Sequence, residues 1–228
     1  MPPTPTFAVI AEGPTDFTVL RQLLAGVFTD PDIVVNQLQP AVDATSGHQS
    51  PGGWYEVFRY LASDRLAGAF DRNDYVVIHI DTDVCEEPYF AVARLDPGGA
   101  PRDIDTMLAL TRERLIGEID PALFERVHHR IIFAIAVESI ECWLLPLYYE
   151  TIHRTKTVNC LGTLNQKLTT AEGFSINPER KEVKRYQTIV RRRLRRAKDI
   201  EAAAPHNPSF AAFLSALRPI LNPPVDAG

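Results

Sequence analysis

The chain has 228 residues, a formal net charge of −5 at pH 7 and a hydrophobic fraction of 45%. This length suits one large α/β domain, or one domain with a helical appendage, and the composition allows a sizeable core. No run reaches the roughly 18 apolar residues of a membrane-spanning helix, and the N-terminus lacks the pattern of a signal peptide. We therefore expect a cytoplasmic protein that makes no contact with a membrane.

Cysteine usage and local charge add to this picture. Cys85, Cys142 and Cys160 are too few and too scattered for a disulfide framework or a zinc cluster, and they fit a reducing cytoplasm. The net charge alone does not indicate a nucleic-acid partner, but local charge sets phosphate attraction. Ten Lys or Arg residues lie between Arg180 and Lys198, which leaves the rest of the chain strongly acidic.

The first predicted elements alternate between strand and helix. Residues 6–11 are apolar on both faces and read as a short buried strand. Thr15 can cap a helix over about 16–28. A second strand is predicted over 33–39, and an amphipathic helix over 54–70.

The alternation continues through the middle of the chain. Residues 75–80 form the clearest buried strand, which ends on Asp81. A helix is predicted over about 103–118, and another buried strand over 131–137, which ends on Glu138.

This order of elements predicts a mostly parallel sheet with helices on both faces, which is an α/β fold. From about residue 159 the pattern is wholly helical. We therefore expect a catalytic domain over 1–150 and a helical C-terminal extension over 151–228 that packs on it. The extension also offers surface for a homodimer.

Acidic residues at strand ends are the main functional signal. Glu12, Asp81 and Glu138 each follow or end a predicted strand, and sites in parallel sheets lie at the carboxyl ends of strands. Glu12 alone could be an ordinary acid at a helix N-terminus, where the macrodipole favours it.

The D-x-D segment strengthens this signal. Asp81 and Asp83 lie on the same side of an extended segment, where two carboxylates repel unless a cation lies between them. Mg²⁺ prefers oxygen ligands, so the pair predicts a metal site. Glu86 could join it or remain solvated in a loop. Glu141 would share a helix face with Glu138, although it could equally be a surface residue.

Two sequence segments, "VIAEGPTDFTVL" and "VVIHIDTDVCEE", resemble a Toprim domain over roughly residues 6–145. The resemblance implies a compact α/β fold in which Glu12 acts as a general acid or base, or holds a metal. It also implies that Asp81 and Asp83 bind Mg²⁺ or Mn²⁺.

The later segments "VESIECWLL" and "NPSFAAFLSAL" resemble a group of stand-alone OLD-like Toprim proteins that are often associated with bacterial defence loci. This resemblance implicates Glu138 and Glu141. Topoisomerase-like members carry D-x-D-x-D, whereas Cys85 occupies the third position here, which disfavours the topoisomerase and primase branches. The chain lacks a G-x-x-x-x-G-K-[ST] phosphate loop, so a partner ATPase or sensor would be a separate protein.

We therefore expect a Mg²⁺- or Mn²⁺-dependent nuclease that cleaves phosphodiester bonds, and the resemblance suggests an anti-phage defence effector. Two alternatives stay open: a non-nuclease phosphotransfer enzyme on the same scaffold, and a binding subunit that a partner ATPase activates. The expected catalytic residues are Glu12, Asp81, Asp83, Glu138 and Glu141, and the expected metal ligands are Glu12, Asp81, Asp83, Glu86 and Glu138.

The basic segment 180–198 reads as a helix that contacts nucleic-acid phosphates, or alternatively as a solvated face paired with acidic neighbours. His48, in a polar loop over 43–53, could contact a phosphate or simply be exposed. The expected nucleic-acid contacts are Lys184, Arg185, Arg191, Arg192, Arg195 and Arg196.

Overall fold

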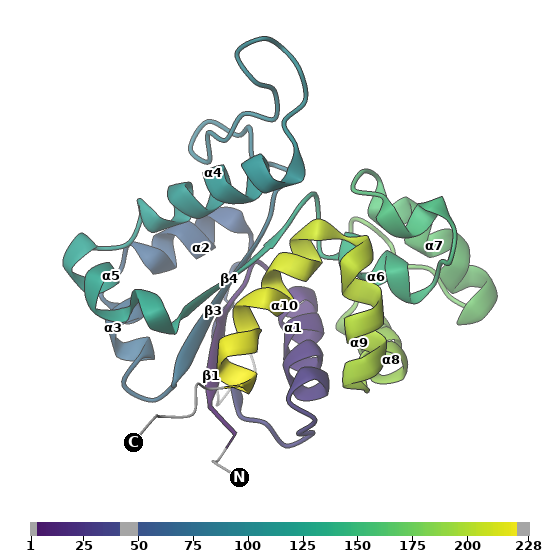
Figure 1. Cartoon of the computed structure of the whole chain (residues 1–228), viewed down its shortest axis with the longest axis horizontal. Helices are drawn as coiled ribbons and strands as arrows, with labels where there is room; N and C mark the ends of the chain where they lie inside the picture. The colour runs from purple at the N-terminus through teal and green to yellow at the C-terminus, as the bar shows by residue number, and fades with distance from the viewer. Residues whose placement is uncertain (1–3, 42–49, 223–228) are drawn as a thin grey trace.

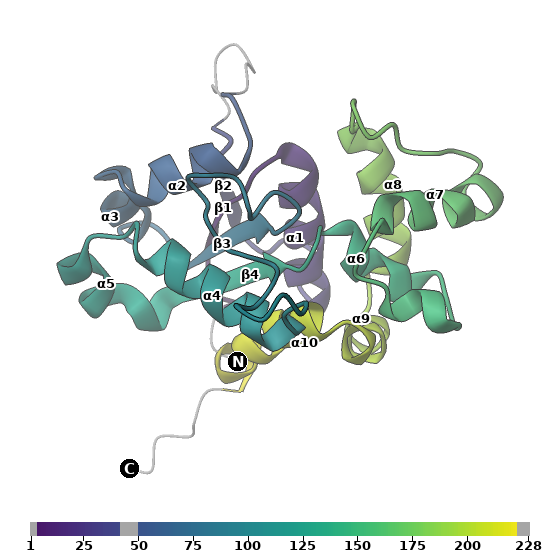
Figure 2. The ribbon, with the colours of Figure 1, turned by 90° about the horizontal axis from the view of Figure 1, so that it is seen from above.

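The computed structural model describes residues 4–41 and 50–222 of the chain, so most of the predicted loop at 43–53, including His48, lies outside the described residues. Its centre is a parallel sheet with helices around it (Figure 1). The four strands lie in the order β2-β1-β3-β4 (Figure 2). The strands are β1 (Phe7–Ile10), β2 (Val35–Gln39), β3 (Tyr75–Asp81) and β4 (Ile131–Ala136). The predicted α/β class with a parallel sheet is confirmed.

Both faces of the sheet are buried, as the uninterrupted apolar strands require. Along β1, Phe7 and Val9 belong to one core, whereas Ala8 and Ile10 belong to the other. This alternation is the period of two that a strand imposes on its side chains. Figure 2 shows the resulting three layers, with helices on either side of the sheet.

One face of the sheet is covered by the helices that follow β2 and β3. They are α2 (Trp54–Leu61), α3 (Arg65–Ala69), α4 (Ile104–Ile116) and α5 (Pro121–Val127). The Asp103 carboxylate accepts a hydrogen bond from the Thr106 amide and so caps α4, and Asp120 caps α5 in the same way through the Leu123 amide.

The opposite face is covered by α1 (Pro14–Val27) and by the helices of the C-terminal third. These are α6 (Glu141–Leu144), α7 (Cys160–Ala171), α8 (Val183–Arg193), α9 (Ala197–Ala203) and α10 (Pro208–Leu221). Leu164, Ile189 and Phe213 of this third share one hydrophobic core with Phe7 and Val9 of the sheet. The helices after residue 150 therefore pack on the sheet.

The described helices depart from the sequence prediction in three places. α1 begins at Pro14 rather than after a Thr15 cap, because proline favours the first helical position. The helix predicted over 54–70 is two helices, α2 and α3. The basic helix predicted over 180–198 ends at Arg193, since Leu194 is buried and its carbonyl accepts a hydrogen bond from the Gln22 side chain of α1.

No helix within residues 4–41 and 50–222 is both long enough and apolar enough to span a bilayer.

Substitution of Gly26 should test the packing of α1 against α8 and α9. A Cβ at Gly26 would collide with the Leu194 carbonyl oxygen and lie 2.6 Å from the Ile200 Cδ1 atom. We expect Gly26→Ala to lower the free energy of unfolding by about 1–3 kcal/mol, measured by denaturant unfolding, because such overpacking forces neighbouring groups to move.

Gly68→Ala is the matched control, since a Cβ there meets no atom within 4 Å. Alanine in that helix should leave stability unchanged or raise it by about 0.5–1 kcal/mol. If Gly26→Ala were as stable as Gly68→Ala, the close approach of α1 to the C-terminal helices would be contradicted.

Candidate active site

The carboxyl ends of β1 and β3 lie side by side at the centre of the sheet. The chain leaves β1 toward β2 on one side and returns to β3 on the other, and ligand sites of open parallel sheets form where the order reverses in this way. Glu12 follows β1, and its Oε1 atom accepts a hydrogen bond of 2.8 Å from the backbone amide of Asp81, which ends β3. The structure therefore brings these two predicted acids into direct contact.

A third carboxylate in this cluster, Asp16, has no role in the sequence prediction beyond starting a helix. It lies in the first turn of α1 and is only 5% exposed. Its side chain folds back toward the turn after β1, because a Cβ at Gly13 would lie 3.2 Å from the Asp16 Oδ2 atom. The spacing of four residues between Glu12 and Asp16, across a strand end and a first helical turn, is the signal that could have revealed it.

Glu141 reaches the cluster from the start of α6, the helix that follows β4. Its carboxylate is 1% exposed and lies 2.8 Å from the Nζ atom of Lys181, and the Tyr186 hydroxyl donates a hydrogen bond to the same Oε1 atom. The Glu141 Oε2 atom is buried without a hydrogen-bond partner in the described residues. Lys181 and Tyr186 both come from the C-terminal third, so this segment completes the site.

Asp81 is held from two sides. Its Oδ1 atom accepts a hydrogen bond of 2.9 Å from the Ile140 amide, which fixes the start of α6 against the end of β3. The same oxygen lies 3.4 Å from Nε2 of His79 on β3. His79 is fully buried, and burial lowers its pKa to about 3, so this imidazole is neutral.

Burial and mutual repulsion shift the carboxyl groups strongly. Removal from water, together with the charge of Asp16, raises the pKa of Glu12 to about 8. Burial and the charge of Glu141 raise the pKa of Asp16 to about 7. Burial and the charge of Asp16 raise the pKa of Asp81. Burial alone would raise the pKa of Glu141, but the Lys181 ammonium and two hydroxyl groups hold it below its ordinary value.

Asp83 stands at the exposed rim of the cluster. Burial raises its pKa, while the Lys181 charge opposes that rise. The loop that carries Asp83 is fixed by Arg94, whose guanidinium donates hydrogen bonds of 2.9 and 2.6 Å to the carbonyls of Thr82 and Asp83. Asp83 therefore lies near the other acids with its backbone anchored.

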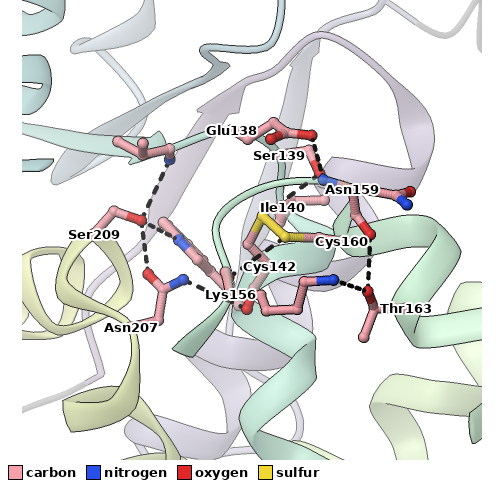
Figure 3. Close-up of a disulfide and its surroundings, with 12 residues drawn as sticks. Glu138, Ser139, Ile140, Cys142, Lys156, Asn159, Cys160, Thr163, Asn207 and Ser209 are labelled. Atoms are coloured by element: carbon pink, nitrogen blue, oxygen red, sulfur yellow. Dashed lines mark hydrogen bonds between the residues drawn. A yellow bond between two sulfur atoms is a disulfide. The ribbon is translucent and has the colours of Figure 1, made fainter. Parts of the chain in front are cut away.

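Two predicted metal ligands lie outside the cluster. Glu86 is exposed, and its Oε1 atom accepts a hydrogen bond from the Arg94 amide. Glu138 turns the other way, and its Oε1 atom accepts a hydrogen bond of 3.0 Å from the Asn159 amide at the start of α7 (Figure 3). The strand end that carries Glu138 does reach the sheet edge, but the following turn presents Glu141 to the cluster instead.

Cys142 and Cys160 form a single disulfide between α6 and α7, whereas the sequence predicts neither a disulfide framework nor an oxidising compartment (Figure 3). Both are buried, and Cys142 directly follows Glu141 of the cluster. A separation of 18 residues gives no pairing signal by itself, since pairing requires the packing of α6 on α7. Cys85 is free and buried.

The Lys181 ammonium, which pairs with Glu141, is a cation that the protein itself supplies to the cluster. Within residues 4–41 and 50–222, no group of three or more His, Cys, Asp or Glu side chains is gathered closely enough to hold a metal ion. Carboxylate oxygens such as those of Glu12, Asp16, Asp81 and Glu141 are nevertheless the ligands that a hard divalent cation prefers, and three of these groups have raised pKa values. One oxygen of the set, Glu141 Oε2, is buried without a hydrogen-bond partner in the described residues. The sequence places Lys181 in a basic run but gives no sign that it enters the site.

The structure divides the predicted nucleic-acid contacts into two sets. Arg185 pairs with Glu182, Arg192 with Glu172, and Arg196 with Asp199. Among the described residues, no carboxylate lies within 4.0 Å of the side-chain nitrogens of Lys184, Arg191 or Arg195. The second set therefore carries uncompensated charge on an exposed surface.

Compared with known proteins, the chain matches no family model, no curated protein and no solved structure.

Stability of the metal-free protein should fall as pH rises. In the unfolded chain Asp16 and Glu12 titrate near 3.8 and 4.5, whereas their folded pKa values are about 7 and about 8. The folded state binds these protons more tightly, so their contribution is full below about pH 4 and is lost as pH rises toward 8. We expect the Tm in EDTA to decrease between pH 5 and 8, and Asp16→Asn to reduce the decrease.

Asp105→Asn is the control for that experiment, because Asp105 is exposed on α4 and should leave the pH dependence unchanged. A Tm in EDTA that stayed level or rose over this pH range would show that the acids are not buried together.

Loss of the Cys142–Cys160 bond should destabilise the oxidised protein. The bond closes a loop with a sequence separation of 18, and cross-links of that size contribute about 3 kcal/mol. We expect Cys160→Ser to lower the free energy of unfolding by about that amount without reductant, and by much less in a dithiol reductant. Cys85→Ser should give the same change in both conditions, and an equal cost of Cys160→Ser in both would contradict the bond.

Proposed function

We propose that this protein is a Mg²⁺- or Mn²⁺-dependent nuclease that hydrolyses phosphodiester bonds at the Glu12, Asp16, Asp81 and Glu141 cluster. The observation that supports it most is the contact of Glu12 with Asp81 at the switch point of the sheet, with Asp16 and Glu141 buried beside them. A group of four carboxylates, of which Asp16, Asp81 and Glu141 are buried, is unfavourable in itself, which favours a role that involves cations.

Under this proposal, Glu12, Asp16, Asp81 and Glu141 are the candidate metal ligands, with Asp83 at the rim. A bound divalent cation supplies Lewis-acid polarisation of the phosphoryl oxygen and neutralises charge on the phosphate. The residues around the cluster contribute orientation: the Asp81 amide holds Glu12, and the Ile140 amide holds Asp81. Preorganised groups of this kind lose no further freedom when substrate binds.

Proton transfer and the stabilisation of charge can be assigned to particular side chains. In hydrolysis the oxygen of water bonds to phosphorus, the bond from phosphorus to the leaving sugar oxygen breaks, and water gives up a proton while the leaving oxygen takes one. Glu12, whose pKa of about 8 is near neutral pH, is suited to exchange these protons. The Lys181 ammonium is partly exposed and can stabilise negative charge on the phosphoryl group.

The proposal keeps nucleic acid as the partner and the cytoplasm as the location, where the Cys142–Cys160 pair would be reduced. A role in defence rests on resemblance alone. A separate ATPase or sensor protein would be an activator rather than part of the site.

Cleavage assays and metal binding test the proposal together. We expect plasmid, single-stranded DNA or tRNA to be cut when Mg²⁺ or Mn²⁺ is present. Glu12→Gln and Asp81→Asn should each reduce the rate by about 10²–10⁴-fold, the range for loss of a general acid or base. Glu113→Gln, an exposed acid on α4, should retain the wild-type rate.

The same metals should raise the Tm. At a concentration of about one hundred times Kd the stabilisation is about 2.7 kcal/mol, or about 5–10 °C for a chain of this size. The shift should vanish in a Glu12, Asp81 and Asp83 triple alanine variant. Absence of a shift in the wild type would contradict the metal site, nucleotide turnover without strand cleavage would select a phosphotransfer enzyme, and cleavage only after a partner is added would select a gated nuclease.

A further inference from the structure

A groove of about 390 Å³ lies between α1 and α8. α1 contributes Pro14, Thr18 and Arg21 to its wall, and α8 contributes Val183, Gln187 and Arg191. None of the residues that line the groove belongs to the cluster of Glu12, Asp16, Asp81 and Glu141, which is called the acid site below.

One end of the groove lies at the acid site. Pro14 follows Glu12 by two residues, and Val183 follows Lys181 by two residues, so the first turns of both helices adjoin the cluster. At the other end, the Gln22 side chain of α1 hydrogen-bonds the carbonyl of Leu194, just past the last turn of α8. The two helices therefore run parallel, and the groove leads away from the acid site over the length of α1 from Pro14 to Ala25, about 16 Å.

The lining chemistry favours an anion with many polar groups. The polar side chains of the groove are amides, one hydroxyl and two guanidinium groups, and none of its lining residues is acidic. Arg21 and Arg191 are exposed, and no carboxylate in the described part of the chain lies within 4.0 Å of either. In a chain with a net charge of −5, such a surface stands out as a site for phosphates.

The charge extends beyond the groove along α8. Lys184 and Arg191 are separated by seven residues, a spacing that keeps their side chains on one side of α8, and Arg195 follows in the bend after the helix. All three are exposed and lack an ion pair among the described residues. A row of cations that begins near the acid site follows the course of a polyanion rather than of a single phosphate.

The form of the groove favours one strand over two. It is a hollow of about 390 Å³ lined by two packed helices, and proteins that bind single strands use a positively charged groove that follows the backbone. We propose that the α1–α8 groove binds a single strand of nucleic acid, with Arg21 and Arg191 on its phosphates, and leads that strand to the acid site. The direction of the strand rests on the proposed function, but binding in the groove does not.

Binding by the double variant Arg21→Gln/Arg191→Gln tests the inference. The probe is a fluorescent single-stranded 12-mer of DNA or RNA, and anisotropy is measured in EDTA so that metal-dependent cleavage cannot interfere. Each cation removed should reduce the dependence of log Kd on log salt by about 0.7, or about 1.4 for both. The loss of affinity caused by the double variant should consequently shrink about sevenfold between 50 and 200 mM salt.

The control Arg59→Gln/Arg72→Gln removes the same charge from exposed positions, Arg59 on α2 and Arg72 in the turn before β3, and should bind as the wild type does. Equal affinities of the groove variant and the wild type at both salt concentrations would overturn the inference. Tighter binding of a duplex of the same length than of the single strand would overturn the single-strand assignment.

The inference and the proposed function fail in different ways. Cleavage activity with an unaffected groove variant would keep the nuclease and remove the groove. Salt-dependent binding that requires Arg21 and Arg191, with no cleavage under any metal, would keep the groove and remove the nuclease. Under both proposals together, the groove variant should raise KM while Glu12→Gln lowers kcat.

Discussion

Several like charges buried at one sheet edge are the constraint on which the rest of this structure depends. Burial, together with repulsion among the carboxylates, raises the pKa values of Glu12, Asp16 and Asp81. Lys181 partly compensates this negative charge, although it lies far beyond the last strand in the sequence. The C-terminal helices are consequently part of the electrostatic balance of the site, because they supply the positive charge that the strand ends lack.

α6 connects this balance to the packing of the whole helical layer. It carries Glu141, and its start is fixed by the hydrogen bond from Ile140 to Asp81. Trp143 on the same helix donates a hydrogen bond of 2.8 Å to Ser209 and stacks on Phe210 of α10. The disulfide also ties α6 to α7. Together these contacts hold a helix of four residues that would not form alone, and so they position the buried Glu141 carboxylate.

The sheet and the central pair of acids could be predicted from the sequence, whereas the rest of the site could not. Short apolar runs that end on charges identify β1 and β3, and the parallel topology then places Glu12 beside Asp81 without further information. Which acid of the turn after β4 points inward depends on local backbone geometry, so Glu138 and Glu141 look equivalent in the sequence.

The contributions of Lys181 and of the Cys142–Cys160 pair depend on tertiary packing, which the hydrophobic periodicity of the sequence does not reveal. The break in the basic segment at Leu194 has the same origin, because it follows from the approach of α8 to α1. The pairing of Arg185, Arg192 and Arg196 with nearby carboxylates also appears only in three dimensions, although it decides which cations are available to a ligand.

The position of α10 limits how copies of this chain can associate. β4 is an outer strand of the sheet, and α10 packs along it, with the Ser209 hydroxyl accepting a hydrogen bond from the Val137 amide just beyond the strand. Outer strands left open invite pairing with a second chain, and a helix across the margin removes that option. Growth of the sheet by strand addition is thereby blocked on this side, so any assembly at this margin must form between helices.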